Sequence, residues 1–62
     1  MNARKKAIAA LETAGYRLKR NGAKHDIYFN AARRRAIPLK RHDFDESDLR
    51  YIEKEITQGE QK

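Results

Sequence analysis

The stretch YRLKRNGAKHDIYF, residues 16–29, predicts a β-hairpin and decides the fold of this 62-residue chain. Apolar and basic side chains alternate strictly over residues 16–20, which is typical of a strand with one buried face. Asn21 and Gly22 form the strongest short signal for a hairpin turn, because both residue types tolerate positive φ angles. The returning strand is predicted over residues 24–29.

A third strand is predicted over residues 35–40, after a polar and basic turn at residues 30–34. Pro38 lies inside this strand and has no N–H to donate to a neighbour, so we expect the strand at an edge of the sheet. The prediction is therefore a three-stranded antiparallel meander.

A helix is predicted over residues 3–14, before the hairpin. Its apolar stripe consists of Ala7, Ile8, Leu11 and Ala14. Asn2 can cap the start of this helix, and Gly15 can end it.

A second helix follows the third strand, with Asp45 or Ser47 as its cap. Its apolar stripe consists of Leu49, Ile52 and Ile56. Gly59 is expected to close it. The fold class is thus α+β over a single domain, residues 1–62: helix, three-stranded antiparallel sheet, helix. Both helices are expected on one face of the sheet, and the other face should be open and basic.

The charge is strongly uneven along the chain. The net charge is +6, and residues 1–42 hold twelve Lys and Arg against two acids, whereas residues 43–62 hold three against seven. A basic body of this kind favours a polyanion such as nucleic acid, or an acidic protein, as partner. The chain has no cysteine, no apolar run near the ~20 residues that span a bilayer and no signal-peptide pattern, so we expect a soluble cytoplasmic protein.

The order of these features resembles the HicA family of toxin ribonucleases, which are small proteins with a fold like the double-stranded-RNA-binding domain. The resemblance covers about residues 5–56. The matching residues are Gly15, Tyr16, Gly22, Lys24, His25, Asp26, Tyr28, Pro38, His42, Leu49, Ile52 and Ile56. The chain departs from the commoner family pattern where Ala23 and Lys24 replace a Gly-Ser pair, and where FDESD, residues 44–48, lacks a frequent glycine.

The resemblance implies a toxin of a toxin–antitoxin pair that cleaves messenger RNA and halts growth. A HicB-like antitoxin would bind the toxin and cover His25 and the basic surface. The functional histidine of the family corresponds to His25 in this chain. No cofactor is implied.

Metal-free RNA cleavage needs a group that moves a proton from the ribose 2′-hydroxyl and a cation that stabilises the phosphate. Histidine suits the first task, because it changes its protonation state near neutral pH. We therefore predict His25 as general acid or base. Strand pleating places His25 on the face of Ile27 and Phe29, opposite Lys24. A bulge would reverse which face is buried, so both orientations stay open.

The other candidate RNA-binding residues are cations and one aromatic. They are Lys19, Arg20, Lys24, Arg33, Arg34, Arg35, Lys40 and Arg41 for phosphate, and Tyr28 for base stacking. Tyr16 is expected in the core. His42 is either a partner acid to His25 or a loop residue without chemistry. No metal site is predicted, because the two histidines and the scattered carboxylates lack a recognisable metal-ligand spacing.

Two other functions fit the same residues. One is a non-catalytic RNA-binding module of the double-stranded-RNA-binding type. Such modules usually have a basic start to the last helix, whereas this helix starts with Asp45, Glu46 and Asp48, which repel phosphate. The other is a small adaptor whose charge asymmetry binds an acidic protein.

Overall fold

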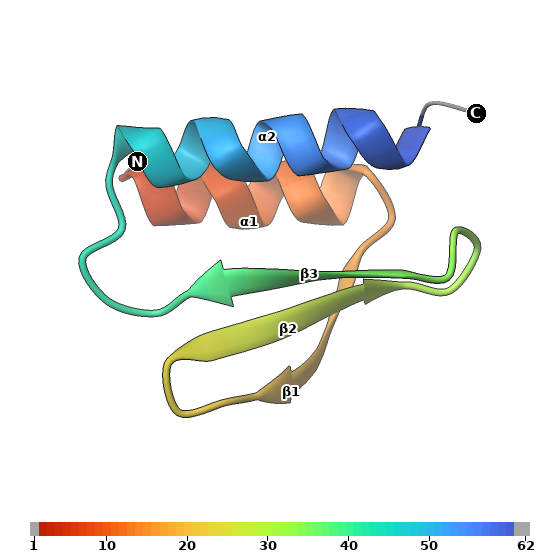
Figure 1. Ribbon diagram of the computed structural model, residues 1–62, viewed down its shortest axis with the longest axis horizontal. Helices are drawn as coiled ribbons and strands as arrows, with labels where there is room; N and C mark the ends of the chain where they lie inside the picture. The colour runs from red at the N-terminus through yellow and green to blue at the C-terminus, as the bar shows by residue number, and fades with distance from the viewer. Residues whose placement is uncertain (1, 61–62) are drawn as a thin grey trace.

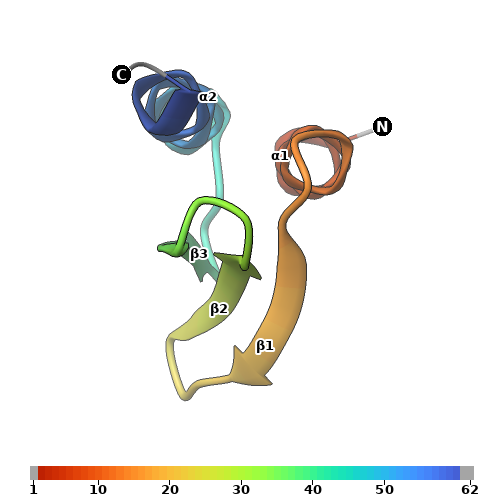
Figure 2. The ribbon, with the colours of Figure 1, turned by 90° about the vertical axis from the view of Figure 1, so that its right-hand side faces the viewer.

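A computed structural model describes residues 2–60 of the chain, which form two helices and three strands. The elements are α1 (Ala3–Thr13), β1 (Arg17–Asn21), β2 (His25–Asn30), β3 (Arg35–Lys40) and α2 (Glu46–Glu60). The strands form an antiparallel sheet in the order β1-β2-β3, so the Pro38 strand lies at an edge as predicted. Figures 1 and 2 show the two helices side by side on one face of the sheet, which confirms the predicted α+β fold.

Both helices are capped at their start by side chains that the sequence predicted as caps. The Asn2 Oδ1 atom accepts a hydrogen bond of 2.8 Å from the Lys5 N–H at the start of α1, and α1 ends just before Gly15. At the start of α2, Asp45 Oδ1 accepts from the Asp48 N–H at 3.1 Å, and Asp48 Oδ2 accepts from the Asp45 N–H at 3.0 Å. Asp45 is therefore the cap, in a reciprocal arrangement that satisfies two otherwise unpaired N–H groups.

The prediction that Gly59 ends the second helix is wrong, because α2 continues through Gly59 to Glu60. A Cβ atom at this position would lie 2.8 Å from Arg35 Cδ and 3.1 Å from the hydroxyl of Tyr16. The absence of a side chain lets α2 approach β3 and the start of β1 closely.

The predicted hairpin is present, whereas the positive φ angles expected at Asn21 and Gly22 are not. Asn21 pairs with Asp26, and the residues with positive φ among 2–60 are Gly15, Arg34 and Asp43, so neither Asn21 nor Gly22 uses that conformation. Gly22 donates its N–H to the carbonyl of His25 at 2.9 Å, and a Cβ on Gly22 would collide with that same oxygen. Gly22 is thus needed for a close approach of the backbone.

The core lies between the helices and one face of the sheet. Its buried members include Ala7 and Leu11 of α1, Tyr16, Tyr28, Ile37 and Leu39 of the sheet side, and Leu49, Ile52 and Ile56 of α2. Tyr16 is fully buried as expected, whereas Leu18, its predicted neighbour on the buried face, is 50% exposed. The register of β1 shifts between Leu18 and Arg20, so a bulge at Lys19 interrupts the alternation.

The structure decides which face of β2 is buried. Asp26, Tyr28 and Asn30 face the helices, while His25 is exposed and Ile27 and Phe29 are half-buried on the open face. Two polar side chains thus take positions that the apolar pattern alone would not assign to the core. Asn30 is accommodated because its Nδ2 donates to the Ala14 carbonyl at 3.0 Å and its Oδ1 accepts from the Arg33 N–H at 3.1 Å.

Residues 1, 61 and 62, which the predicted domain includes, lie outside the described residues. Within residues 2–60, neither α1 nor α2 combines the length and the apolar character that crossing a membrane requires. Among residues 2–60, ten hydrophobic residues are buried, which is a small core of the kind expected for a short chain.

Candidate functional site

His25 is the first residue of β2 and is exposed on the open face of the sheet, directly opposite Lys40 of β3. It lines a hollow of about 310 Å³ together with Lys24, Lys40, His42 and Asp43. We call this the histidine hollow. It unites both histidines of the chain with two lysines, although the sequence had left the role of His42 open.

Lys24 belongs to the site because it lies in the turn before β2 and not in the strand. The pleating that would have placed Lys24 on the opposite face from His25 therefore does not apply. The Lys24 carbonyl accepts a hydrogen bond of 3.0 Å from the Arg41 N–H, which joins this turn to the end of β3. The turn and the strand end that carry the site are thus held to each other.

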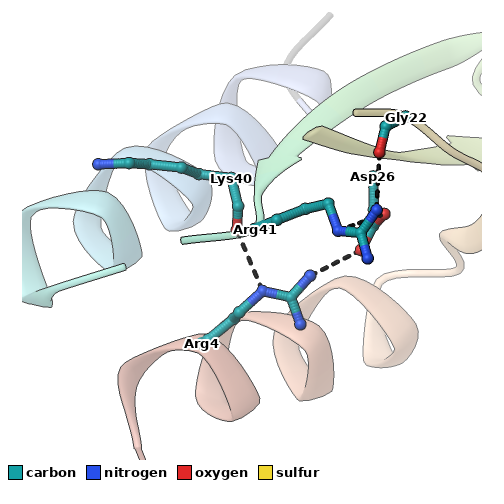
Figure 3. Close-up of polar contacts among 5 residues, drawn as sticks. All are labelled: Arg4, Gly22, Asp26, Lys40 and Arg41. Atoms are coloured by element: carbon teal, nitrogen blue, oxygen red, sulfur yellow. Dashed lines mark hydrogen bonds and ion pairs between the residues drawn. The ribbon is translucent and has the colours of Figure 1, made fainter. Parts of the chain in front are cut away.

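A polar network beneath the site fixes these segments (Figure 3). The Arg4 guanidinium bonds Asp26 Oδ2 at 2.7 Å and donates from Nε to the Lys40 carbonyl at 3.0 Å. Arg41 donates from Nη1 to the Gly22 carbonyl at 2.8 Å, and its Nε lies 3.7 Å from Asp26 Oδ1. Asp26 is 8% exposed, so its carboxylate is a buried charge held between two arginines.

The sequence pointed to this network only in part. Asp26 is one of two acids within residues 1–42, so a cationic partner was to be expected. Nothing in the sequence indicates that the partner is Arg4, which is separated from Asp26 by 22 positions. Arg41, predicted to bind phosphate, is engaged with Gly22 and Asp26 and so supports the hairpin in this structure.

A group of three arginines that was predicted to bind phosphate lies at the other end of the sheet. We call Arg33, Arg34 and Arg35 the arginine cluster. Arg35 pairs with Asn30, five residue pairs from the His25–Lys40 pair, which corresponds to about 17 Å along a strand. The Arg35 Nη2 atom also bonds Glu55 Oε1 of α2 at 2.9 Å, which ties it to the helical side. Arg33 and Arg34 are exposed in the turn. The cluster is therefore separate from the histidine hollow.

The cations of β1 lie nearer to the site. Arg20 pairs with Ile27, which places the two side chains on the same, open face. Lys19 sits at the bulge with its Nζ 4.6 Å from the centre of the Phe29 ring, a cation–π contact. Both side chains are exposed, and we call Lys19 and Arg20 the basic strip of β1.

Tyr28 does not fit its predicted role in base stacking, because it is 6% exposed and packs in the core. Burial raises the pKa of its hydroxyl, and the nearby Arg4 charge opposes that rise. The exposed aromatic near the site is instead Tyr51 of α2, which is 50% exposed. Its position off the Leu49–Ile52–Ile56 stripe was a signal available in the sequence.

The site offers two imidazoles for proton transfer and the Lys24 ammonium for a phosphate, while the Lys40 ammonium donates to the Asp43 carbonyl at 3.2 Å and lies 3.5 Å from Asp48 Oδ2. Among residues 2–60, no three His, Cys, Asp or Glu side chains come together in a way that could hold a metal ion. No family model, curated protein or solved structure matches the chain. What the chain does is therefore inferred from the site itself.

Proposed function

We propose that the chain is a metal-independent endoribonuclease that cleaves messenger RNA, as a toxin of the HicA kind. The observation that carries the proposal is the histidine hollow, in which His25 and His42 lie with Lys24 and Lys40. One imidazole can accept a proton while the other donates one, which is the minimum that cleavage by the ribose 2′-hydroxyl requires.

In the proposed reaction, one imidazole takes the proton of the 2′-hydroxyl, whose oxygen then attacks the adjacent phosphorus. The bond from phosphorus to the 5′-oxygen breaks, and the second imidazole protonates that leaving oxygen. The products are a 2′,3′-cyclic phosphate and a 5′-hydroxyl. Lys24 stabilises the negative charge that builds up on the phosphate oxygens. The Lys40 ammonium is engaged with the Asp43 carbonyl at 3.2 Å and lies 3.5 Å from Asp48 Oδ2.

The open face of the sheet would bind the rest of the strand. Lys19 and Arg20 lie on this side of the molecule and can contact successive phosphates without reading sequence. The acidic start of α2, with Glu46 and Asp48, disfavours duplex binding across that end of the helix. A single strand is therefore the proposed substrate.

The toxin proposal includes a partner and a location. A HicB-like antitoxin that covers His25 and the basic strip would block cleavage, and messenger RNA as the target places the activity in the cytoplasm. Charge complementarity supports an acidic covering surface on that partner.

The test is incubation of the purified chain with a long single-stranded RNA in excess EDTA, followed by mapping of the cut ends. We expect cleavage with cyclic phosphate ends, and loss of cleavage in His25→Ala and in His42→Ala. Lys54→Ala, an exposed residue of α2 outside the hollow, is the matched control and should cut like the unaltered chain.

Ordinary 3′-hydroxyl ends would refute the mechanism. RNA binding without cleavage, with and without added ribosomes, would support the alternative of a non-catalytic RNA-binding module. Unchanged cutting by both histidine variants would remove the histidine hollow from the reaction.

A further inference from the structure

A second hollow, of about 240 Å³, adjoins the histidine hollow between β3 and α2. The residues around it are His25, Pro38, Lys40, Phe44, Asp48, Tyr51 and Ile52. We call it the aromatic hollow. His25 and Lys40 line both hollows, so whatever occupies the aromatic hollow lies next to the proposed cleavage site.

The walls of the aromatic hollow suit a flat ring. Phe44 packs against the core and Ile52 is buried, so both are held in place, while Tyr51 is half exposed and Pro38 is exposed. The volume is below the ~300–1,000 Å³ of pockets for larger ligands. One nucleobase, stacked on an aromatic side chain, is a ligand of the right size and shape.

The polar edge of the hollow carries a cation beside a carboxylate. Lys40 Nζ lies 3.5 Å from Asp48 Oδ2, and the Lys40 side chain extends toward the start of α2 in Figure 3. The backbone hydrogen bond from Asp45 lowers the pKa of the Asp48 carboxyl, and the charge of Lys40 lowers it further. Asp48 therefore stays ionised at neutral pH and acts only as an acceptor.

A donor next to an acceptor matches one edge of every base. Guanine and uracil present a carbonyl oxygen next to a ring N–H, and adenine and cytosine present an accepting ring nitrogen next to an amino group. In each case Lys40 can donate to the accepting atom and Asp48 can accept from the donating group, with the ring turned to suit. The pair can therefore hold the edge of any of the four bases.

We propose that the aromatic hollow binds a nucleobase next to the scissile phosphate, that Tyr51 stacks on it, and that Lys40 with Asp48 holds its hydrogen-bonding edge. This inference rests on the proposed ribonuclease function for its biological meaning. It assigns to the site a base-binding position, carried by the start of α2, in addition to the chemistry of the histidines.

Binding of single nucleotides tests the inference without any need for cleavage. The intact chain is titrated with GMP, AMP, UMP and CMP while NMR follows the signals of Tyr51 and Phe44. We expect all four nucleotides to shift these signals, whereas ribose 5-phosphate, which carries no base, should not. Tyr51→Ala should weaken GMP binding about tenfold or more, and Tyr51→Phe should retain it.

Two further variants complete the test. Leu18→Ala removes the other large apolar side chain that is 50% exposed and should leave binding unchanged. Asp48→Asn should weaken the binding of the nucleotides, with the folded fraction of the variant checked by circular dichroism. The Tyr51 variants leave the cap of α2 intact, so they keep the test valid if Asp48→Asn fails to fold.

The failures of the two proposals are distinguishable. If GMP perturbs Tyr51 as described and RNA is not cut, the base site stands and the ribonuclease proposal falls. If RNA is cut but no nucleotide perturbs Tyr51, or if ribose 5-phosphate perturbs it as GMP does, the base site is refuted alone. Equal binding of GMP by the unaltered chain and by Tyr51→Ala refutes it as well.

Discussion

Arg4 of α1 holds Asp26 of β2 across the core edge, with 2.7 Å between the Arg4 Nη2 and Asp26 Oδ2 atoms. The same guanidinium bonds the Lys40 carbonyl at the end of β3, so one side chain joins the first helix to both strand ends beneath the histidine hollow. A carboxylate as buried as that of Asp26 is costly unless cations compensate it. The positions of the strand ends that carry the site residues therefore depend on these contacts of Arg4 and Asp26.

Replacing Arg4 should destabilise the fold. Arg4→Ala leaves Asp26 with Arg41, whose Nε is 3.7 Å from the carboxylate, and frees the Lys40 carbonyl. We expect the free energy of unfolding to fall by about 1–3 kcal/mol. Urea unfolding measures this, with Lys5→Ala, an exposed neighbour in the same helix, as the control. Equal stability of the two variants would show that Asp26 does not depend on Arg4.

Alanine at position 59 should fail to stabilise α2. In a helix interior, Gly→Ala ordinarily gains up to about 1 kcal/mol. Here the new Cβ would lie 2.8 Å from Arg35 Cδ, and moving Arg35 would disturb its pair with Glu55, while the fully buried Tyr16 cannot retreat. We expect Gly59→Ala to lower Tm, whereas the exposed Gln58→Ala should keep or raise it. A higher Tm for Gly59→Ala would contradict the close packing of α2 at this position.

The secondary structure could be predicted because its signals are local. The alternation in β1, the apolar stripes of the helices and the side chains that cap them each involve residues a few positions apart. The buried face of β2 could not be predicted, because Ile27 and Phe29 look like core residues and Asp26 and Asn30 do not. Asp26 and Asn30 are buried because partners distant in sequence, Arg4 and the Ala14 carbonyl, satisfy them.

The candidate site, like the fold, could be predicted from the sequence only in part. His25 and Lys24 could be named, but their joint placement depends on a turn that begins at Gly22 and ends just before β2. His25 and His42 line the same hollow, and the register that sets His25 opposite Lys40, close to His42 in the chain, is fixed by no local pattern. Tyr51 was not among the predicted site residues, and the aromatic that was predicted there, Tyr28, is buried in the core.

Glycine at position 34 should stabilise the turn between β2 and β3. Arg34 has a φ of 52°, a conformation that costs an L-residue about 1–2 kcal/mol and glycine little. Arg34→Gly is therefore expected to raise the free energy of unfolding by up to about 1 kcal/mol. Arg33→Gly, in the same turn but without a positive φ, should lower it. Thermal unfolding of both variants measures these changes in stability. A lower stability of Arg34→Gly would contradict the conclusion that the turn is strained at Arg34.

The pH dependence of stability should carry a contribution from Asp48. Its pKa is lowered in the folded state, first by the backbone hydrogen bond from Asp45, so the unfolded state binds more protons at acidic pH. The stabilising contribution is thus fully present above pH ~4, which is the ordinary pKa of an aspartate carboxyl. It is lost as the pH falls through the lower pKa of the folded state. Asp48→Asn lacks this contribution. The difference in Tm between the unaltered chain and Asp48→Asn should shrink on acidification, and a constant difference would refute the assignment.

Lys24 should matter for cleavage more than for RNA affinity. It lines the histidine hollow from the turn before β2, where its ammonium group can meet charge that develops on the phosphate during the reaction. Lys24→Gln is expected to lower kcat/KM by at least about tenfold, with most of the loss in kcat. Lys24→Arg keeps the charge and should recover part of the activity. Lys54→Gln removes an exposed lysine of α2 outside the hollow and serves as the control. A loss confined to KM would make Lys24 an ordinary phosphate contact, and an unchanged kcat/KM would exclude it from the site.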